Sequence, residues 1–323
     1  MVADGRKVLA AQLASSLKQH QKYGGVVPEI ASRAHVELLT CELEALLSAA
    51  DVKPSQVDRI AVTHGPGLSG CLLIGVAAAK ALGLAWKKEM VPVNHLHAHL
   101  YAALMDLEKP LLAERMIGLV ISGGHTALVR MDGIHRYELL GQTRDDAVGE
   151  AFDKVAKLLG LGFPGGPEIE KIAKQGNPSA FRFSPSKMKA GSPYEFSFSG
   201  IKTAVLYKVK DELRSSQGAP LSPAFVADMA SSFQSAVVEE VVEKTIRACR
   251  EAGIIHLAVG GGVVANSLLR QRLVEECGKM GIQPYIPPMR LCTDNGAMVG
   301  GLGHHLQPVP PLELTARPEL GVS

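Results

Sequence analysis

Aromatic side chains are scarce in this sequence of 323 residues, in which they make up 5% and Trp86 is the single tryptophan. An aromatic-rich β-sandwich is therefore not favoured, whereas the 33 glycines suit α/β layers joined by tight turns. An excess of one charge is also lacking, because 34 Lys and Arg residues against 32 Asp and Glu residues leave a net charge of +2. A nucleic-acid partner would therefore need a local basic patch, since the protein as a whole is not basic.

Closely spaced cysteines are absent, because the five cysteines are far apart and form no CxxC pair. This spacing is typical of reduced thiols in a cytosolic protein and argues against a zinc ribbon. The first ten residues contain no apolar core of a signal peptide, and the weakly polar stretch 60–79 is interrupted by Pro66 and four glycines. We therefore expect a cytoplasmic protein with no membrane span.

Strand-like and helix-like patterns alternate along the chain, which favours an α/β fold, and the length predicts about two domains. We expect a first lobe over residues 1–110, a boundary near Lys109-Pro110, and a second lobe over 111–323 with a helical insertion at about 145–250. Helices are predicted over 29–48 and 69–86, from the N-cap Asn94 onward, and from about residue 266. Strands are predicted over 8–16, 60–62, 91–93, 117–121, 126–131 and 254–259.

His95 and His99 lie one helical turn apart after the predicted N-cap. Two imidazoles at this spacing can share a metal ion, although a polar flank of the helix is the other interpretation. The lack of a glutamate at position 96, which HExxH would require, counts against a protease motif. A third ligand is needed, and Asp294 is a candidate, unless it is simply an aspartate in a turn.

Two glycine-rich turns, at 122–124 and 260–262, each follow an apolar strand. Backbone N–H groups in such turns bind phosphate or carboxylate oxygens. Neither turn continues into the Lys and Ser/Thr of a P-loop, and neither is a GxGxxG motif. Each by itself is explained by a tight turn, but the two together, with the glycine pair at 165–166, favour a nucleotide site.

Two further patterns leave a choice between a site and a solvated surface. Asp146, Glu150 and Asp153 follow helical spacing, so their carboxylates could bind ribose hydroxyls or a metal, or simply face water. The segment 182–210 carries a net charge of +5 with interleaved aromatic residues, which suits an RNA backbone with stacked bases or an ordinary solvated loop.

Taken together, these motifs resemble the universal tRNA threonylcarbamoyltransferase family, formerly classed as glycoproteases. The resemblance runs from about residue 19 to about residue 303 in the family's order. It is carried by residues 22–33, the His95/His99 pair, and residues 122–126, 149–154, 163–167, 196–200, 260–266 and 293–296.

The resemblance implies an α/β, two-lobed actin/Hsp70-like ATPase (ASKHA) fold. It also implies one divalent metal ion, Fe²⁺ or alternatively Zn²⁺, held by His95, His99 and Asp294. No general base is assigned. The residues implied for binding threonylcarbamoyl-AMP are Val120, Ile121, Ser122, Gly123, Gly124, Asp153, Gly166, Glu170 and Asn266.

The implied activity is transfer of the threonylcarbamoyl group from threonylcarbamoyl-AMP to the exocyclic amine of adenosine 37 of tRNA, 3′ of the anticodon. The tRNAs are those that read codons beginning with adenine, and AMP is released. The implied protein partners are a TsaB-like paralogue and a TsaE-like ATPase. The alternatives are an ATP-dependent kinase or ATPase of the same fold, a metalloprotease, and a non-catalytic nucleotide-binding scaffold.

One departure from the family concerns the N-terminus. The family begins with a strand and a loop of the form Gly-Ile-Glu-Thr-Ser-Cys-Asp-Glu-Thr, which has no counterpart in this sequence. Loss of a central strand would cost more than the net stability of a typical domain. We therefore expect a start codon upstream of Met1, the alternative being an inactive paralogue.

Overall fold

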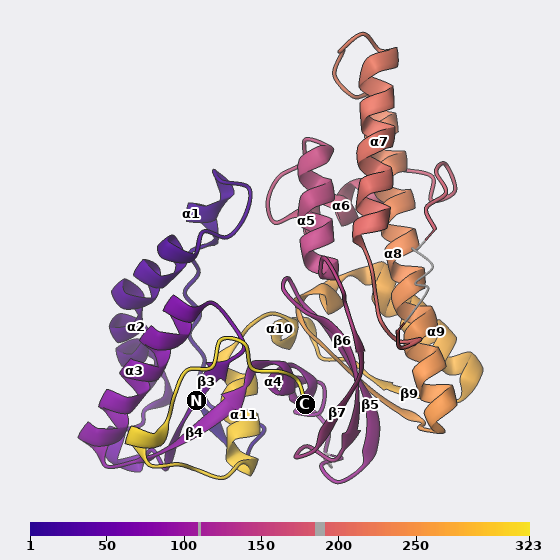
Figure 1. Cartoon of the computed structure of the whole chain (residues 1–323). Helices are drawn as coiled ribbons and strands as arrows, with labels where there is room; N and C mark the ends of the chain where they lie inside the picture. Colours follow the sequence, from indigo (N-terminus) through magenta and orange to yellow (C-terminus); the bar gives the residue numbers. More distant parts are fainter. Residues whose placement is uncertain (109–110, 185–190) are drawn as a thin grey trace. The chain divides into compact units, whose positions relative to one another are not determined.

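The computed structural model describes residues 1–108, 111–184 and 191–323 (Figure 1). The chain forms two compact units. Unit 1 comprises Met1–Glu114, Gly133–Tyr137 and Pro287–Ser323, and unit 2 comprises Arg115–Asp132 and Glu138–Ile286. The division differs from the predicted lobes because the C-terminal segment packs with the first unit. The predicted boundary at Lys109-Pro110 lies outside the described residues.

Unit 1 contains a two-stranded parallel sheet, in which Ile60 pairs with Met90, and the helices that pack on it. The predicted helices over 29–48 and 69–86 are confirmed. The elements are β1 (Val2–Ala3), β2 (Lys7–Val8), α1 (Leu17–Gln21), α2 (Pro28–Ala50), β3 (Arg59–Gly65), α3 (Ser69–Trp86), β4 (Glu89–Asn94), α4 (His95–Ala102), α10 (Met289–Cys292) and α11 (Gly296–His305), with short 3₁₀ turns at Pro54–Gln56 and Pro311–Glu313.

The predicted strand over 8–16 is wrong beyond its first residue. Val8 ends β2, which pairs with β1 in a short antiparallel hairpin, and residues 9–16 are neither strand nor helix. The apolar residues of this segment do not reach the core, and the side chain of Leu13 is 75% exposed. Apolar residues without a neighbouring strand edge and a core to cover do not make a strand.

Unit 2 is built on a five-stranded mixed sheet of order β7-β6-β5-β8-β9. The predicted hairpin is confirmed as β5 (Arg115–Ile121) and β6 (Thr126–Asp132), and the strand predicted over 254–259 as β8 (His256–Gly260). The remaining strands, β7 (Tyr137–Gln142) and β9 (Gln283–Tyr285), were not predicted. β5 and β8 are parallel neighbours, with Val120 opposite Gly260, so the glycine turns that follow them lie together.

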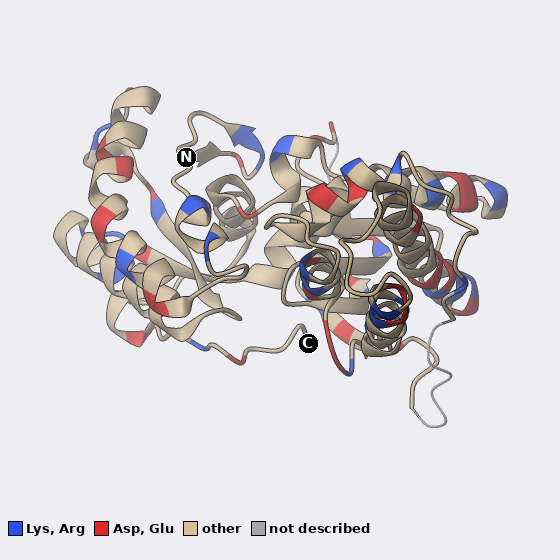
Figure 2. Ribbon diagram, turned by 90° about the horizontal axis from the view of Figure 1, so that it is seen from above, with Lys and Arg blue, Asp and Glu red and all other residues tan. Residues whose placement is uncertain are grey.

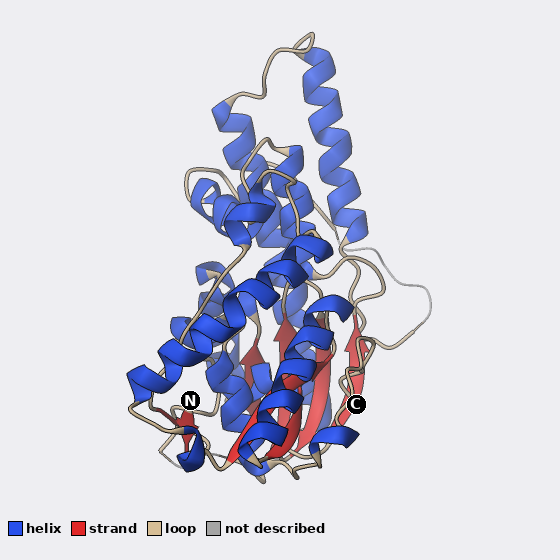
Figure 3. Cartoon of the chain, turned by 90° about the vertical axis from the view of Figure 1, so that its left-hand side faces the viewer, coloured by secondary structure: helices blue, strands red, loops and turns tan. Residues whose placement is uncertain are grey.

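The described part of the chain between β7 and β8 is mainly helical, as predicted for this stretch (Figure 1). Figure 3 distinguishes the helices and strands of the described chain by colour. Lys and Arg residues are interspersed with Asp and Glu in both units (Figure 2). The helices of unit 2 are α5 (Val148–Leu158), α6 (Gly165–Ala173), α7 (Ser199–Ser215), α8 (Pro223–Ala252) and α9 (Ser267–Met280), with a 3₁₀ turn at Gly262–Ala265.

The α3 helix is the one helix, within the described residues, whose length and composition would allow it to cross a membrane. Core helices have the same composition, and α3 packs against β3 and α2. Its inner side buries Leu72 and Val76, whereas Leu73 and Leu84 on the outer side are exposed. The helix is therefore apolar on two sides, of which one covers the sheet of unit 1.

Candidate functional site

The first candidate site lies in unit 1, at the start of α4. Asn94 caps this helix, because its Oδ1 accepts hydrogen bonds from the N–H groups of Leu96 (2.9 Å) and His97 (3.4 Å). His95 and His99 are four residues apart on this capped helix, so they lie on the same face. The Nε2 atoms of these two residues lie 3.4 Å and 3.2 Å from Oδ1 of Asp294.

The structure therefore brings together the three residues predicted as metal ligands. One donor atom from each lies within 4.8 Å of the other two. The side chain of His99 is fully buried and that of His95 is 18% exposed, whereas that of Asp294 is 78% exposed. The cluster thus has a buried side, formed by α4, and a side open to solvent.

The protonation states of the cluster suit a cation. Partial desolvation opposes ionisation of Asp294, but hydrogen bonds from His95 and His99 outweigh it and hold the pKa of this carboxyl well below its ordinary value. Burial lowers the pKa of His99, against the opposing effect of its hydrogen bond to Asp294. An ionised carboxylate and neutral imidazoles are the forms that ligate metal ions.

The donor set fits a divalent metal. Two imidazoles and one carboxylate are the ligands of open sites for first-row metals, which keep coordination positions for water or substrate. The Nε2 atom of His99 faces Asp294, whereas its buried Nδ1 atom has no hydrogen-bond partner among the described residues. The donor set and its geometry agree with a metal centre built from His95, His99 and Asp294.

The third histidine of the segment, His97, points away from this cluster. Its ring stacks on Tyr137, with centroids 3.6 Å apart, and its Nε2 lies 2.8 Å from the backbone oxygen of Val322. Burial lowers the pKa of His97 to about 4, so the neutral ring donates its N–H to that oxygen. The role of His97 is to attach α4 to the C-terminal segment.

The second candidate site lies in unit 2, where three backbone segments meet. Gly261 has a φ of +107°, and a Cβ on it would lie 2.1 Å from the backbone oxygen of Ile121. A Cβ on Gly149, at the start of α5, would lie 2.7 Å from Cα of Gly123. Only glycine allows these approaches, which bring the turns 122–124 and 260–262 and the start of α5 together.

Other glycines of the two turns, and Gly166 at the start of α6, face open space. A Cβ on Gly123, Gly124, Gly166 or Gly262 would meet nothing within 4 Å. Backbone N–H groups at such positions are accessible to a ligand oxygen. The two kinds of glycine therefore have different roles, since one kind closes the turn and the other leaves room beside it.

The side chains of unit 2 that were predicted to bind the substrate already form hydrogen bonds with backbone N–H groups of the protein. Asp153 accepts a hydrogen bond from the N–H of Gly165 (2.7 Å), and burial raises the pKa of its carboxyl against the effect of that bond. Asn266 caps α9 through the N–H of Leu269 (3.0 Å), and Glu170 accepts a bond from the N–H of Ser267 (3.1 Å). These side chains hold helix ends beside the turns.

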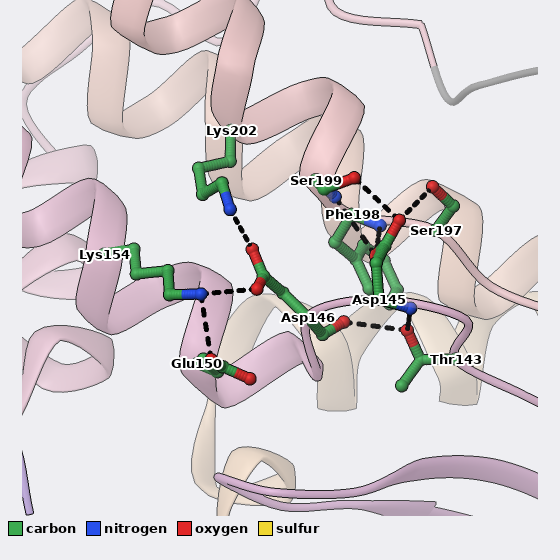
Figure 4. Close-up of polar contacts among 9 residues, drawn as sticks. All are labelled: Thr143, Asp145, Asp146, Glu150, Lys154, Ser197, Phe198, Ser199 and Lys202. Carbon is green, nitrogen blue, oxygen red and sulfur yellow. Dashed lines mark hydrogen bonds and ion pairs between the residues drawn. The ribbon is translucent and has the colours of Figure 1, made fainter.

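A polar network that the sequence analysis missed joins α5 to α7 (Figure 4). Asp145 accepts hydrogen bonds from the hydroxyls of Ser197 (2.6 Å) and Ser199 (2.7 Å) and from the N–H of Phe198 (2.8 Å). It thereby binds the start of α7. No local pattern in the sequence indicates this contact, because the two serines lie more than fifty residues after the aspartate.

The neighbouring carboxylates are used for structure. Asp146 forms ion pairs with both Lys154 and Lys202, and Glu150 pairs with Lys154 (Figure 4). Of the predicted stripe, Asp146 and Glu150 are therefore neutralised by lysines.

The basic segment 182–210 differs from the prediction in two respects. Lys202 is paired with Asp146 and is not a separate cation. Phe196 and Phe198 are fully buried, so their interpretation as stacking surfaces for bases is wrong. Tyr207 is 61% exposed, and Lys187 and Lys189 lie outside the described residues.

Residues 7–301 match the family model of TsaD, tRNA N6-adenosine threonylcarbamoyltransferase. The chain belongs to this family. Among curated family members, the tRNA N6-adenosine threonylcarbamoyltransferase of Dictyoglomus turgidum is 47% identical, over 99% of this chain and 94% of the relative. That of Thermomicrobium roseum is 48% identical, over 95% of this chain and 87% of the relative.

Solved structures establish the fold of this family member. The chain is similar to HypF of T. kodakarensis, with a TM-score of 0.59 and 16% identity over 84% of this chain and 43% of HypF. A full-length HypF structure gives a TM-score of 0.56 and 15% identity over 84% of this chain and 41% of that protein. The chain thus spans less than half of HypF, and the likeness confirms the predicted α/β actin/Hsp70-like fold.

Removal of a ligand from the metal centre is expected to abolish tight metal binding. His99→Ala or Asp294→Ala should weaken Zn²⁺ binding at least ~100-fold, because two donors do not replace three. Competition with a chromogenic chelator measures the affinity. His97→Asn is the control on the same helix, and equal losses in all three variants would contradict the assignment.

Two adjacent glycines should respond differently to alanine. Gly261→Ala is expected to lower the free energy of unfolding by about 2–3 kcal/mol, because the residue has a positive φ and lies against Ile121. Gly262→Ala should change it by less than about 0.5 kcal/mol, as at an unconstrained position. Urea unfolding measures both values, and a similar loss in both variants would contradict the described turn.

The Asp145 network should make stability depend on pH. Burial opposes ionisation of Asp145, but bonds from Ser197, Ser199 and Phe198 lower its pKa, so its contribution is present above about pH 4 and is lost as the pH falls. Because the side chain is only partly buried, Asp145→Asn should cost only about 1 kcal/mol at pH 7. Urea unfolding at several pH values should show this difference shrinking in acid, whereas exposed Asp58→Asn should show none.

Proposed function

We propose that this chain transfers the threonylcarbamoyl group of threonylcarbamoyl-AMP to the exocyclic amine of adenosine 37, 3′ of the anticodon, in tRNAs that read codons beginning with adenine. AMP is the second product. The observation that carries the proposal is the family match over residues 7–301. The identity of 47% over 94% of a curated relative supports it.

The chemistry is acyl transfer between two nucleotides. The amine nitrogen attacks the carbonyl carbon of the threonylcarbamoyl group, the bond from this carbon to the phosphate oxygen of AMP breaks, and the amine loses a proton. AMP is a good leaving group, so orientation of the two reactants supplies much of the catalysis. The protein's contribution is therefore to bind and orient them, and no side chain is assigned as a general base.

The nucleotide part of the substrate is proposed to bind unit 2. The N–H groups at Ser122, Gly123 and Gly124, in the turn that continues from Val120 and Ile121, would donate to phosphate or acyl oxygens. Open space beside Gly123, Gly124 and Gly166 supports this proposal. The residues proposed to contact the nucleoside are Asp153, Gly166, Glu170 and Asn266.

One divalent metal ion is proposed as the cofactor, Fe²⁺ or alternatively Zn²⁺, and His95, His99 and Asp294 would hold it. A bound divalent cation supplies Lewis-acid polarisation of a carbonyl. The residues themselves keep the site anionic, because the carboxylate is ionised and the buried ring of His99 is neutral.

The proposed setting is the cytoplasm, with tRNA as the nucleic-acid partner and a TsaB-like paralogue and a TsaE-like ATPase as protein partners. The exposed side of α3 carries an apolar stripe of Leu73, Ala77, Ala81 and Leu84, which supports a protein partner. Contiguous exposed apolar side chains of this kind mark interaction surfaces.

A reconstituted transfer assay tests the proposed function. The purified chain, its two protein partners, threonylcarbamoyl-AMP and unmodified tRNA should yield the modified nucleoside and AMP, detected by mass spectrometry. Asp294→Ala should reduce the rate at least ~100-fold, while exposed Asp58→Asn should leave it unchanged. Phosphate release from ATP without tRNA would favour a kinase or ATPase instead, and nucleotide binding without any product would favour a scaffold.

A further inference from the structure

Few neighbouring atoms pack against the side chain of Asp294, so packing around this side chain does not fix the position of its carboxylate. Its side chain is 78% exposed, whereas the ring of His99 that it meets is fully buried. The two residues are 195 positions apart in the chain. Their contact therefore depends on how the segment that carries Asp294 is held against α4.

The segment around Asp294 is rigidly continuous with α11. Asn295 caps this helix by accepting the N–H of Met298 (2.9 Å), and its own amide group donates to the backbone oxygen of Thr293 (2.8 Å). The first bond lies just after Asp294, and the second spans it. A shift of α11 along α4 would therefore carry the carboxylate with it.

A hydrogen bond formed by the buried side chain of Tyr101 links the other end of α11 to α4. The hydroxyl of Tyr101 lies 2.9 Å from Nε2 of His305, the last residue of α11, and 2.9 Å from the backbone oxygen of Gly5. The hydroxyl has one hydrogen, which it donates to Gly5, so it accepts the N–H of His305. Tyr101 is 1% exposed, and it follows His99 by two residues on α4.

The surface of α11 is shaped for this tyrosine. A Cβ on Gly301 would lie 2.9 Å from Cε1 of Tyr101 and 2.7 Å from the oxygen of Gly5. The ring therefore occupies a notch that only glycine leaves open. Close packing and the hydrogen bond act at the same place, so the register of α11 on α4 is fixed there.

We propose that Tyr101 and His305 are positioning residues of the metal centre. Their hydrogen bond fixes α11 on α4 and thereby holds the carboxylate of Asp294 against His95 and His99. The inference rests on the metal part of the proposed function. It assigns a role to two residues that lie outside the ligand set.

A second link joins neighbouring segments, α10 and the residues after α4, but is exposed. Arg290, just before Asp294 in the chain, pairs with both carboxylate oxygens of Asp106 at 2.7 Å and 2.8 Å, and their side chains are 61% and 48% exposed. Exposed ion pairs contribute little to stability. This pair therefore serves as a comparison for the buried link.

The test measures Zn²⁺ affinity of the metal-free full chain by competition with a chromogenic chelator. Tyr101→Phe, which keeps the ring in its notch, and His305→Ala should each weaken binding about 3- to 10-fold. The double variant should bind Zn²⁺ as tightly as the single variant with the lower affinity, because the bond that the two side chains share is lost only once. His305→Gln, which retains an N–H donor, should recover part of the affinity.

Two controls separate positioning from a general loss of stability. Tyr137→Phe removes another tyrosine hydroxyl of unit 1, which donates to the backbone oxygen of Ile134 at 3.0 Å, and leaves its ring on His97. Arg290→Gln removes the exposed link. Both variants should bind Zn²⁺ within about twofold of the unchanged chain, and urea unfolding of each metal-free protein gives the matching stability.

The outcomes distinguish this proposal from the function on which it rests. Unchanged affinity in Tyr101→Phe, equal losses in Tyr101→Phe and Tyr137→Phe, or additive losses in the double variant would each overturn the positioning role. If the unchanged chain bound no Zn²⁺, or bound it equally well after His99→Ala, the metal centre and the positioning role would both fail. A third outcome would refute only the proposed reaction. In that case the unchanged chain binds Zn²⁺ and the variants lose affinity as expected, but no threonylcarbamoyl group is transferred to tRNA.

Discussion

The contact between α4 and α11 is the constraint on which the proposed metal centre of unit 1 depends. The two histidines come from α4 and Asp294 from the segment just before α11, so neither part of the chain could form the cluster alone. The buried ring of His99 and the exposed carboxylate of Asp294 are matched only when the helices keep one relative register. The C-terminal segment is therefore an integral part of the first unit.

Unit 2 depends on a corresponding constraint in its sheet. The parallel pairing of β5 with β8 brings two glycine turns to the same edge of the sheet. Gly261 then lies against Ile121, and Gly149 against Gly123, at distances that exclude any side chain. The space left beside the other glycines follows from this tight backbone packing, as in many sites for phosphate groups.

Local patterns in the sequence were sufficient for much of the fold and for part of the site. Helical spacing identified the pair His95 and His99, and the N-cap at Asn94 set the helix that carries them. The apolar run of α3 and the hairpin with a glycine turn were also predicted correctly from local patterns. These features depend on residues within a few positions of one another, which is the range over which spacing is informative.

The rest depends on contacts between distant positions. Spacing made Asp294 only a candidate ligand, because nothing local distinguishes it from any aspartate in a turn. Asp145 was missed because its partners lie on another helix, and Phe196 looked like a surface residue because its burial is created by tertiary packing. The strand predicted over 8–16 failed for the same reason, since an apolar run becomes a strand only beside a partner.

The attachment of the last residues to α4 has a practical consequence. The backbone oxygens of Gly321 and Val322 accept hydrogen bonds from Asn94 and His97, the residues that cap and flank the helix of the histidine pair. A tag inserted beside Val322 would therefore disturb the hydrogen bonds that hold this helix. Recombinant versions of this protein are better labelled at an exposed loop of unit 2, such as the one that joins α7 to α8.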